Sequence, residues 1–263
     1  MVSVLAAGLD LVLPRRCGGC GRPATGLCAA CQLALLGPVR RREFGAARLV
    51  PADGDAPLPV WCSAWYLGSV RRAIVAWKRH GQAELDVDMA RAVRRVAEAV
   101  APTLTEVLAT MGWPHLTVVP IPSRLTNRWR RPGASTRQLA LAVAGGLSDA
   151  GVTATVVTGL HRRLGAPDQA GRSTRQRMLG REGTTLVKPG LVGPVLLVDD
   201  VLTTGATLLD AERALARCQV ATLGAIVLAA TPKAGIVHQS LGSGTMGGNN
   251  LTGSANWDRL AEH

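Results

Sequence analysis

Blocks of apolar and polar positions follow one another along the chain with spacings that predict an α/β fold. Helical spacing of apolar residues predicts helices over Met1–Leu13, Ser69–Arg79, Leu85–Val100 and Leu208–Leu215, and from a capping Ser135 to about Leu147. Runs of strand-forming residues predict strands over Trp61–Tyr66, Leu116–Ile121, Ala154–Leu160, Val195–Val201 and Ala221–Ala230. Because strands and helices alternate, the sheet is expected to be mainly parallel.

Shifts in composition divide the chain into four parts. Residues 1–37 hold the first helix and a cysteine module, and residues 38–60, rich in Pro, Gly and charge, are typical of a linker. Residues 61–232 carry the strand–helix alternation. Residues 233–263 are rich in Gly, Ser, Thr and Asn with little apolar periodicity, which predicts a disordered tail.

The most specific pattern is a buried strand that ends in two acids and a polar loop. Four apolar residues precede Asp199 and Asp200, and the loop Thr203–Thr207 leads into a helical segment. Ligands of open α/β sheets bind at the carboxyl ends of strands, and the first N–H groups of a helix attract anions. The acids would repel an anion unless they bind sugar hydroxyls or Mg²⁺, so the pattern predicts a pentose 5-phosphate site. The predicted contacts are Asp199, Asp200, Thr203, Thr204, Gly205, Ala206 and Thr207.

Two CxxC pairs lie near the amino terminus. Cys17 and Cys20 are followed seven residues later by Cys28 and Cys31, a spacing that lets two turns present four thiolates to one tetrahedral Zn²⁺. A site with four cysteine ligands has no open position, so zinc would be structural. The alternative is a pair of disulfides in an exported domain. Because the first residues lack a basic region and a small-residue cleavage site, a cytoplasmic protein with reduced thiols is expected.

The segment Val195–Thr207 resembles the phosphoribosyl-pyrophosphate (PRPP) signature of type I phosphoribosyltransferases. The resemblance implies the type I phosphoribosyltransferase fold, in which the two acids contact the ribose 2- and 3-hydroxyls and the loop holds the 5-phosphate, with Mg²⁺ bound alongside PRPP. Purine-salvage members carry an Asp at the first loop position. This chain has Thr203 there, which weighs against transfer to a purine.

The cysteine module and the PRPP signature together resemble the ComF (GntX-like) family, which is linked to bacterial competence and DNA uptake. Further matching motifs are Tyr66–Gly81, Val118–Arg124 and the pattern of Leu160, Arg162, Gln169 and Arg177. The resemblance gives candidates for the pyrophosphate and loop contacts: Lys78, Ser123, Arg124, Arg131, Arg162, Gln169 and Arg177. The family's Arg-Gly-Phe-Asn-Gln block is Arg131–Ser135 here and lacks the Phe and the Asn, and Gly180 replaces a further Asn.

The net charge indicates possible binding partners, and the hydropathy argues against a membrane-spanning protein. The net charge is +12, and arginine supplies nearly all of the cations, which suits nucleic acid or polyphosphate; codon bias is the alternative explanation. Single-stranded DNA is therefore a candidate partner. No apolar run reaches the ~18 residues of a membrane span.

The family resemblance implies displacement of pyrophosphate from C1 of Mg²⁺-bound PRPP by a nitrogen nucleophile that the sequence does not identify. Catalytic residues are left unassigned for that reason. Two alternatives stay open: a non-catalytic protein that senses PRPP and binds single-stranded DNA, and a PRPP-responsive regulator.

Overall fold

A mainly parallel sheet forms the centre of the molecule. The computed structural model describes residues 15–50, 56–79, 84–122, 136–162 and 184–232. The strands are β1 (Arg40–Arg41), β2 (Val60–Cys62), β3 (Ala64–Trp65), β4 (Leu116–Pro120), β5 (Ala154–Val156), β8 (Val195–Leu202) and β9 (Thr222–Ala230). Their order in the sheet is β1-β2-β9-β8-β4-β5, with β3 also beside β9. Only β1 is antiparallel to its neighbour in this sheet, so the predicted α/β fold is confirmed.

Strand β8 lies at the middle of the sheet, between β4 and β9. Its first four residues, Val195–Val198, are completely buried, as expected for a strand covered on both faces. The register places Pro120 of β4 opposite Val198, and Val227 of β9 opposite Asp199. The acid pair therefore lies at the carboxyl edge of the sheet, where the sequence predicted a ligand site.

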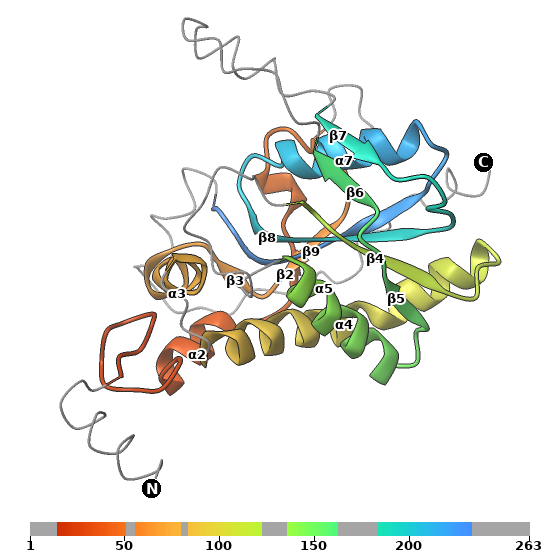
Figure 1. Ribbon diagram of the computed structural model, residues 1–263. Coiled ribbons are helices and arrows are strands. Elements are labelled where there is room, and N and C mark those ends of the chain that lie inside the picture. The colour runs from red at the N-terminus through yellow and green to blue at the C-terminus, as the bar shows by residue number, and fades with distance from the viewer. Residues whose placement is uncertain (1–14, 51–55, 80–83, 123–135, 163–183, 233–263) are drawn as a thin grey trace, which may run out of the picture.

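Helices cover both faces of the sheet (Figure 1). On one face lie α3 (Gly68–Arg79), α4 (Glu84–Thr110) and α5 (Thr136–Asp149). On the other lie α7 (Ala206–Ala216) and a small antiparallel pair formed by β6 (Leu160–Arg162) and β7 (Thr185–Val187). Each face has its own hydrophobic cluster, and residues Val195–Val198 of β8 alternate between the two clusters.

Helix α4 is longer than the sequence predicted. It was expected to end at Val100 but continues through Pro102. A proline donates no hydrogen bond and crowds the carbonyl four residues earlier, that of Glu98. Both residues are exposed to solvent, so water can bind this carbonyl. The continuation buries Leu104, Val107 and Leu108. The burial of these side chains offsets the cost of the proline.

Two predicted strands are each divided in the structure. The stretch Ala154–Leu160 ends one strand at Val156 and begins another at Leu160, in a different sheet. Between them, the N–H of Gly159 donates to the carbonyl of Val157 at 2.9 Å. The stretch Trp61–Tyr66 forms β2 and β3, which both pair with β9. The sequence did not predict β7, because three residues are too few to show a period.

The cysteine module docks on the helices of the first face. It contains α2 (Ala29–Leu35), and Cys17, Leu27, Cys31 and Leu35 belong to the same buried cluster as Trp77 of α3. The carboxylate of Asp88 on α4 accepts hydrogen bonds from the N–H of Leu27 at 2.9 Å and from Gln32 at 3.0 Å. The module therefore shares its core with α3 and α4.

Much of the segment expected as a linker is packed against the sheet. It contains β1 and a 3₁₀ turn, η1 (Glu43–Gly45). Glu43 is completely buried; it pairs with Arg41 and accepts a hydrogen bond from the N–H of Val60 at 3.1 Å. Beyond the turn, Ala46 and Leu49 are buried against the loop that follows β8.

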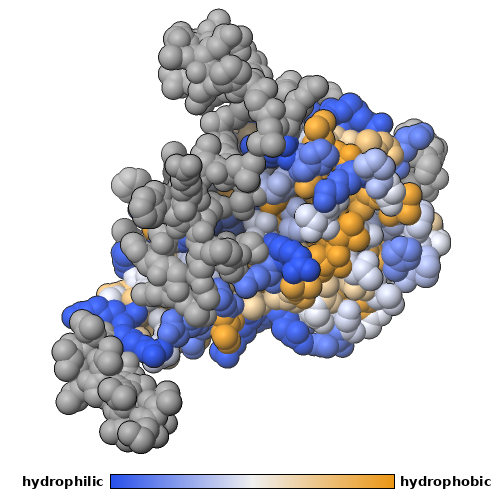
Figure 2. Space-filling model, viewed as in Figure 1, coloured by the Kyte–Doolittle hydropathy of each residue, from blue (hydrophilic) through white to orange (hydrophobic). Residues whose placement is uncertain are grey.

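The surface differs between the two ends of the molecule. In the view of Figure 2, hydrophilic residues surround the cysteine module, whereas hydrophobic residues gather toward the side where β4, β5 and β6 lie. None of the helices in the described segments combines the length and the apolar content that crossing a membrane requires.

The packing of the 42–49 segment on Gly205 can be tested by substitution. Gly205 has φ +79°, and an added Cβ would lie 2.4 Å from Cγ of Leu49. We expect Gly205→Ala to lower the free energy of unfolding by about 2–4 kcal/mol, from backbone strain and overpacking together, in urea titrations.

Gly190→Ala is the matched control for this change. Gly190 has φ +86° but no atom within 4 Å of the added Cβ, so only the backbone cost of about 1 kcal/mol is expected. Equal losses in the two variants would contradict the close packing at Gly205.

Candidate functional site

Asp199 and Asp200 point to opposite faces of the sheet. Side chains alternate along β8: Leu196 and Val198 belong to the cluster on the α3 face, and Val195 and Leu197 to the cluster on the α7 face. Asp200 lies on the α3 side, where it pairs with Lys78, and Asp199 is acted on by the charge of Arg162 from β6 on the α7 side. Both are half-buried, and Asp199 Oδ1 accepts the N–H of Asp200 at 2.8 Å.

Lys78 of α3 forms an ion pair with Asp200. The two side chains are 20% and 16% exposed, so water screens their attraction less than at an open surface. The sequence named Lys78 as a candidate contact to pyrophosphate. The structure places it directly at the acid pair, from the helix that packs against the cysteine module.

The pKa of Asp199 is raised by its surroundings. Burial, followed by the charge of Asp200, raises the pKa of Asp199 to about 7, although the N–H of Asp200, Lys78 and Arg162 act in the opposite direction. Near neutral pH this carboxyl is thus divided between its protonated and ionised forms. A divalent cation at the acid pair would favour the ionised form.

Arg162 of β6 contributes positive charge on the Asp199 side. Its field lowers the pKa of that acid. Its buried Nε donates no hydrogen bond to any described residue. The sequence predicted Arg162 as an anion contact, and the structure places it where its charge acts on the acid pair.

The loop after β8 leads directly into α7. Thr203 and Thr204 are exposed, Gly205 adopts the left-handed conformation, and α7 begins at Ala206. The N–H of Ala206 donates to Oγ1 of Thr204 at 3.4 Å. The N–H groups of the first turn of a helix lack carbonyl partners within the helix, so this end of α7 suits an anion.

Two further contacts fix the loop and α7. The carbonyl of Thr204 accepts the N–H of Arg48 at 3.0 Å. On α7, the buried carboxylate of Asp210 accepts hydrogen bonds from Thr184 at 2.9 Å and Thr185 at 2.6 Å. The loop is therefore held from the 42–49 segment, and the helix from β7.

The structure brings part of the predicted site together. Lys78, Arg162, Asp199 and Asp200 meet at the carboxyl end of β8, and the loop follows directly. The remaining candidates lie outside the described residues: Ser123, Arg124, Arg131, Gln169 and Arg177.

Sequence reasoning missed the 42–49 segment near the site. Besides Arg48, it contains Arg42, whose guanidinium carbon lies 3.8 Å from the centre of the Trp65 ring. Burial lowers the pKa of Arg42. The Pro- and Gly-rich composition of the surrounding segment, residues 38–60, gave no signal of contact with the loop after β8, because such contacts depend on the tertiary fold.

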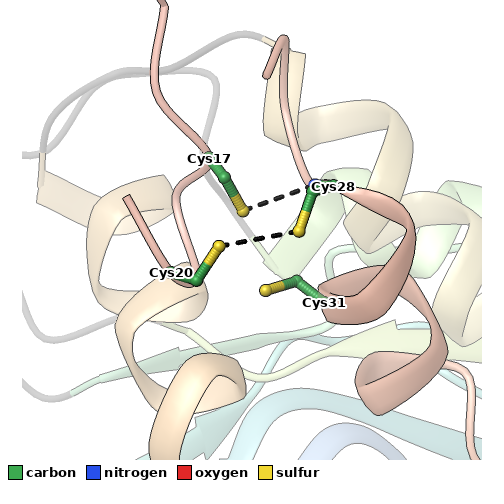
Figure 3. A group of neighbouring side chains, drawn as sticks. All are labelled: Cys17, Cys20, Cys28 and Cys31. Atoms are coloured by element: carbon green, nitrogen blue, oxygen red, sulfur yellow. Dashed lines mark hydrogen bonds between the residues drawn. The ribbon is translucent and has the colours of Figure 1, made fainter. Parts of the chain in front are cut away.

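The four cysteines form a compact cluster (Figure 3). Their sulfur atoms all lie within 4.8 Å of one another, and the Sγ atoms of Cys20 and Cys28 are 3.6 Å apart. Four sulfurs around a tetrahedral zinc with Zn–S bonds of ~2.3 Å would be ~3.8 Å apart. All four cysteines are free thiols in the structure. The donor set and spacing therefore fit zinc.

Hydrogen bonds prepare one of these thiols for ionisation. Burial alone would raise the pKa of Cys17, but the backbone N–H groups of Cys28, Cys20 and Gly19 outweigh this effect and lower the pKa to about 6. Burial and the neighbouring cysteines raise the pKa of Cys31 to about 12. A bound Zn²⁺ would supply the positive charge that lets all four ionise.

Comparison with known families matches the second half of the chain. Residues 167–241 match the model of the phosphoribosyl transferase domain, a segment that includes β8, the loop, α7 and β9. No curated protein matches the chain. The chain thus contains a phosphoribosyltransferase-type segment, and its mixed α/β fold is phosphoribosyltransferase-like.

Solved structures give weaker matches. Adenine phosphoribosyltransferase from Leishmania donovani aligns at 14% identity and a TM-score of 0.28, covering 52% of this chain and 53% of that one. The enzyme from Leishmania tarentolae aligns at 17% identity and a TM-score of 0.27, covering 51% and 56%. The chain thus spans about half the length of these structures.

Metal analysis can test the cysteine cluster. We expect about one zinc per chain in freshly purified protein, and Cys20→Ser to lose the metal and lower the Tm by at least ~5 °C. Cys218→Ser, which changes an exposed cysteine outside the cluster, should keep the zinc and leave the Tm unchanged. Less than about half an equivalent of zinc in the unmodified protein would count against the site.

Asp199 should make stability depend on pH. Its pKa is raised above the ordinary 3.8, so the folded state holds the proton more tightly, and this contribution is lost as the pH rises through about 7. Asp199→Asn carries no charge at this position. The Tm of this variant minus that of the unmodified protein should therefore increase between pH 4.5 and pH 8, by ~3 °C in total.

The control for this titration is Asp149→Asn, because Asp149 is 57% exposed. Its difference in Tm from the unmodified protein should be constant over the same range. A Tm difference for Asp199→Asn that does not change with pH would show that Asp199 is ionised throughout.

Proposed function

We propose that this protein binds PRPP with Mg²⁺ at the carboxyl end of β8 and transfers its phosphoribosyl group. One observation carries the proposal: two acids at the end of a central parallel strand are followed by a Thr-Thr-Gly loop at the start of α7, within a segment that matches the phosphoribosyl transferase domain. The arrangement supplies both kinds of contact that a phosphorylated sugar needs.

Different residues bind the ribose, the 5-phosphate and the pyrophosphate of PRPP. Asp199 and Asp200 bind the ribose hydroxyls and hold Mg²⁺ directly or through water. The loop from Thr203 to Thr207 holds the 5-phosphate through its hydroxyls and the first N–H groups of α7. Lys78 and Arg162, which lie on opposite faces of the acid pair, neutralise the pyrophosphate.

The reaction is a displacement at C1 of the ribose. The bond between C1 and the pyrophosphate oxygen breaks, a bond from C1 to a nitrogen nucleophile forms, and the nucleophile loses a proton. Positive charge develops on the sugar as pyrophosphate leaves, so the protein contributes by orienting the ribose and stabilising the leaving group. Thr203 makes a purine a poor choice of acceptor.

The cysteine module supports a finer assignment, a ComF-like protein linked to DNA uptake. A zinc-bound module of residues 1–37 ahead of the phosphoribosyltransferase-like domain of residues 61–232 is the arrangement on which that resemblance rests. Six free thiols suit a reducing cytoplasm. Exposed Arg16 and Arg22 on the module offer cations to single-stranded DNA, whereas the nearby Arg15 pairs with Glu84.

Thermal unfolding with ligand can test PRPP binding. Saturating PRPP with excess Mg²⁺ should raise the Tm by ~4 °C, because a ligand that binds only the folded state stabilises it. The double change Asp199→Ala and Asp200→Ala should abolish the shift, since it removes the hydroxyl and metal ligands. Asp149→Ala, which removes an exposed acid elsewhere, should leave the shift intact.

No shift in the unmodified protein would refute the PRPP proposal. Where the shift is present, pyrophosphate release with a panel of nitrogen bases and amines separates a transferase from a protein that only senses PRPP. Oligonucleotide binding that weakens with added salt would support the DNA role.

A further inference from the structure

The cysteine module contacts α3 at a residue inside its first CxxC pair. The carbonyl of Gly19 accepts a hydrogen bond from Nε of Arg72 at 2.6 Å. A Cβ added at Gly19 would lie 2.8 Å from Sγ of Cys31 and 3.2 Å from the carbonyl oxygen of Ser69. The backbone at Gly19 therefore lies against both a cysteine of the cluster and the first turn of α3, with no room for a side chain.

The module itself is fixed on α4. Asp88 accepts hydrogen bonds from the N–H of Leu27 and from Gln32, and Arg95 donates to the carbonyl of Leu36. These contacts bind both ends of the second CxxC region to one long helix. The module can therefore serve as a fixed support for α3.

Helix α3 connects this support to the candidate site. Arg72 and Lys78 lie on one uninterrupted helix, and six residues at 1.5 Å per residue separate them by ~9 Å. Ile74 and Trp77 are buried between them, and the indole of Trp77 donates to Asp86 of α4 at 2.8 Å. A shift at the first turn would therefore be passed along the helix to Lys78.

Lys78 is the cation that pairs with Asp200, and its charge also acts on Asp199. The attraction between Lys78 and Asp200 depends on how far the ammonium group lies from the carboxylate. A small displacement of α3 would thus change the charge balance of both acids. A distant part of the chain that moves α3 can consequently affect the site by moving Lys78.

We infer that the zinc-loaded cysteine module positions Lys78 at the acid pair through Arg72 and α3, so that an intact module strengthens binding of the Mg²⁺–PRPP ligand. The inference rests on the ligand proposed above. Arg72 is thus a positioning residue that acts through Lys78. Because linked binding equilibria are reciprocal, the ligand should in turn raise the affinity of the module for zinc, measured by competition with a chelator at equilibrium.

The position of Lys78 can be measured without any ligand. The chain contains only three lysines, Lys78, Lys188 and Lys233, so ¹³C-dimethylation of the zinc-loaded full chain gives few NMR signals, and Lys78→Arg assigns the one of interest. Arg72→Ala should move this signal toward that of an exposed lysine. Arg71→Ala, the neighbouring exposed arginine, should leave it in place.

Binding of Mg²⁺–PRPP tests whether Arg72 acts through Lys78. Arg72→Ala and Lys78→Ala should each weaken binding about tenfold. The double variant should be no weaker than the weaker single variant, because both changes remove the same interaction. Arg72→Gln, which keeps a donor for Gly19, should recover part of the loss, and Arg71→Ala should leave the affinity unchanged.

Three outcomes would overturn the inference: a Lys78 signal that Arg72→Ala does not move, additive losses of affinity in the double variant, or equal effects of Arg71→Ala and Arg72→Ala. Failure of the proposed function is distinguishable from these. The unmodified protein would then not bind Mg²⁺–PRPP, while the Lys78 signal would still decide whether the module positions the lysine.

Discussion

Two carboxylates on consecutive residues of a central strand cost free energy unless positive charge or protons offset them. In this protein the two faces of the sheet share that task. Lys78 comes from the helical layer on one side and pairs with Asp200, whereas Arg162 comes from the small β6–β7 sheet on the other side and acts on Asp199. The offset is incomplete at Asp199, whose pKa lies near 7. A divalent cation bound at the two acids would offset the remaining free-energy cost of ionising Asp199.

The loop that we propose to bind the 5-phosphate depends on backbone geometry rather than on charge. Gly205 turns the chain from β8 into α7, and the 42–49 segment packs so closely on it that no side chain fits. Asp210 ties α7 to β7 through two threonine hydroxyls. The first turn of α7 is thereby oriented before a ligand arrives, which lowers the entropy cost of binding.

The sequence predicted the parts of the fold that local patterns encode. The run Val195–Val198 consists of strand-forming residues without a polar interruption, so a buried strand that ends at the two acids could be predicted. The spacing of the cysteines likewise predicted their cluster. The extent of α4 beyond Pro102 was not foreseeable, because burial of later side chains outweighs the local effect of proline. Nor was the packing of residues 42–49 on Gly205, since no local pattern encodes a contact between segments some 150 residues apart.

The pairing of β2 with β9 constrains how the chain folds during synthesis. Residues near position 60 hydrogen-bond to residues near 225, so the sheet cannot close until β9 has left the ribosome. The cysteine module emerges early, yet the chain has by then no strand on which to complete the core around it. Non-local parallel pairing of this kind folds slowly and leaves apolar edges exposed in the meantime. Early capture of zinc would keep four reactive thiols from oxidising or cross-linking during that interval.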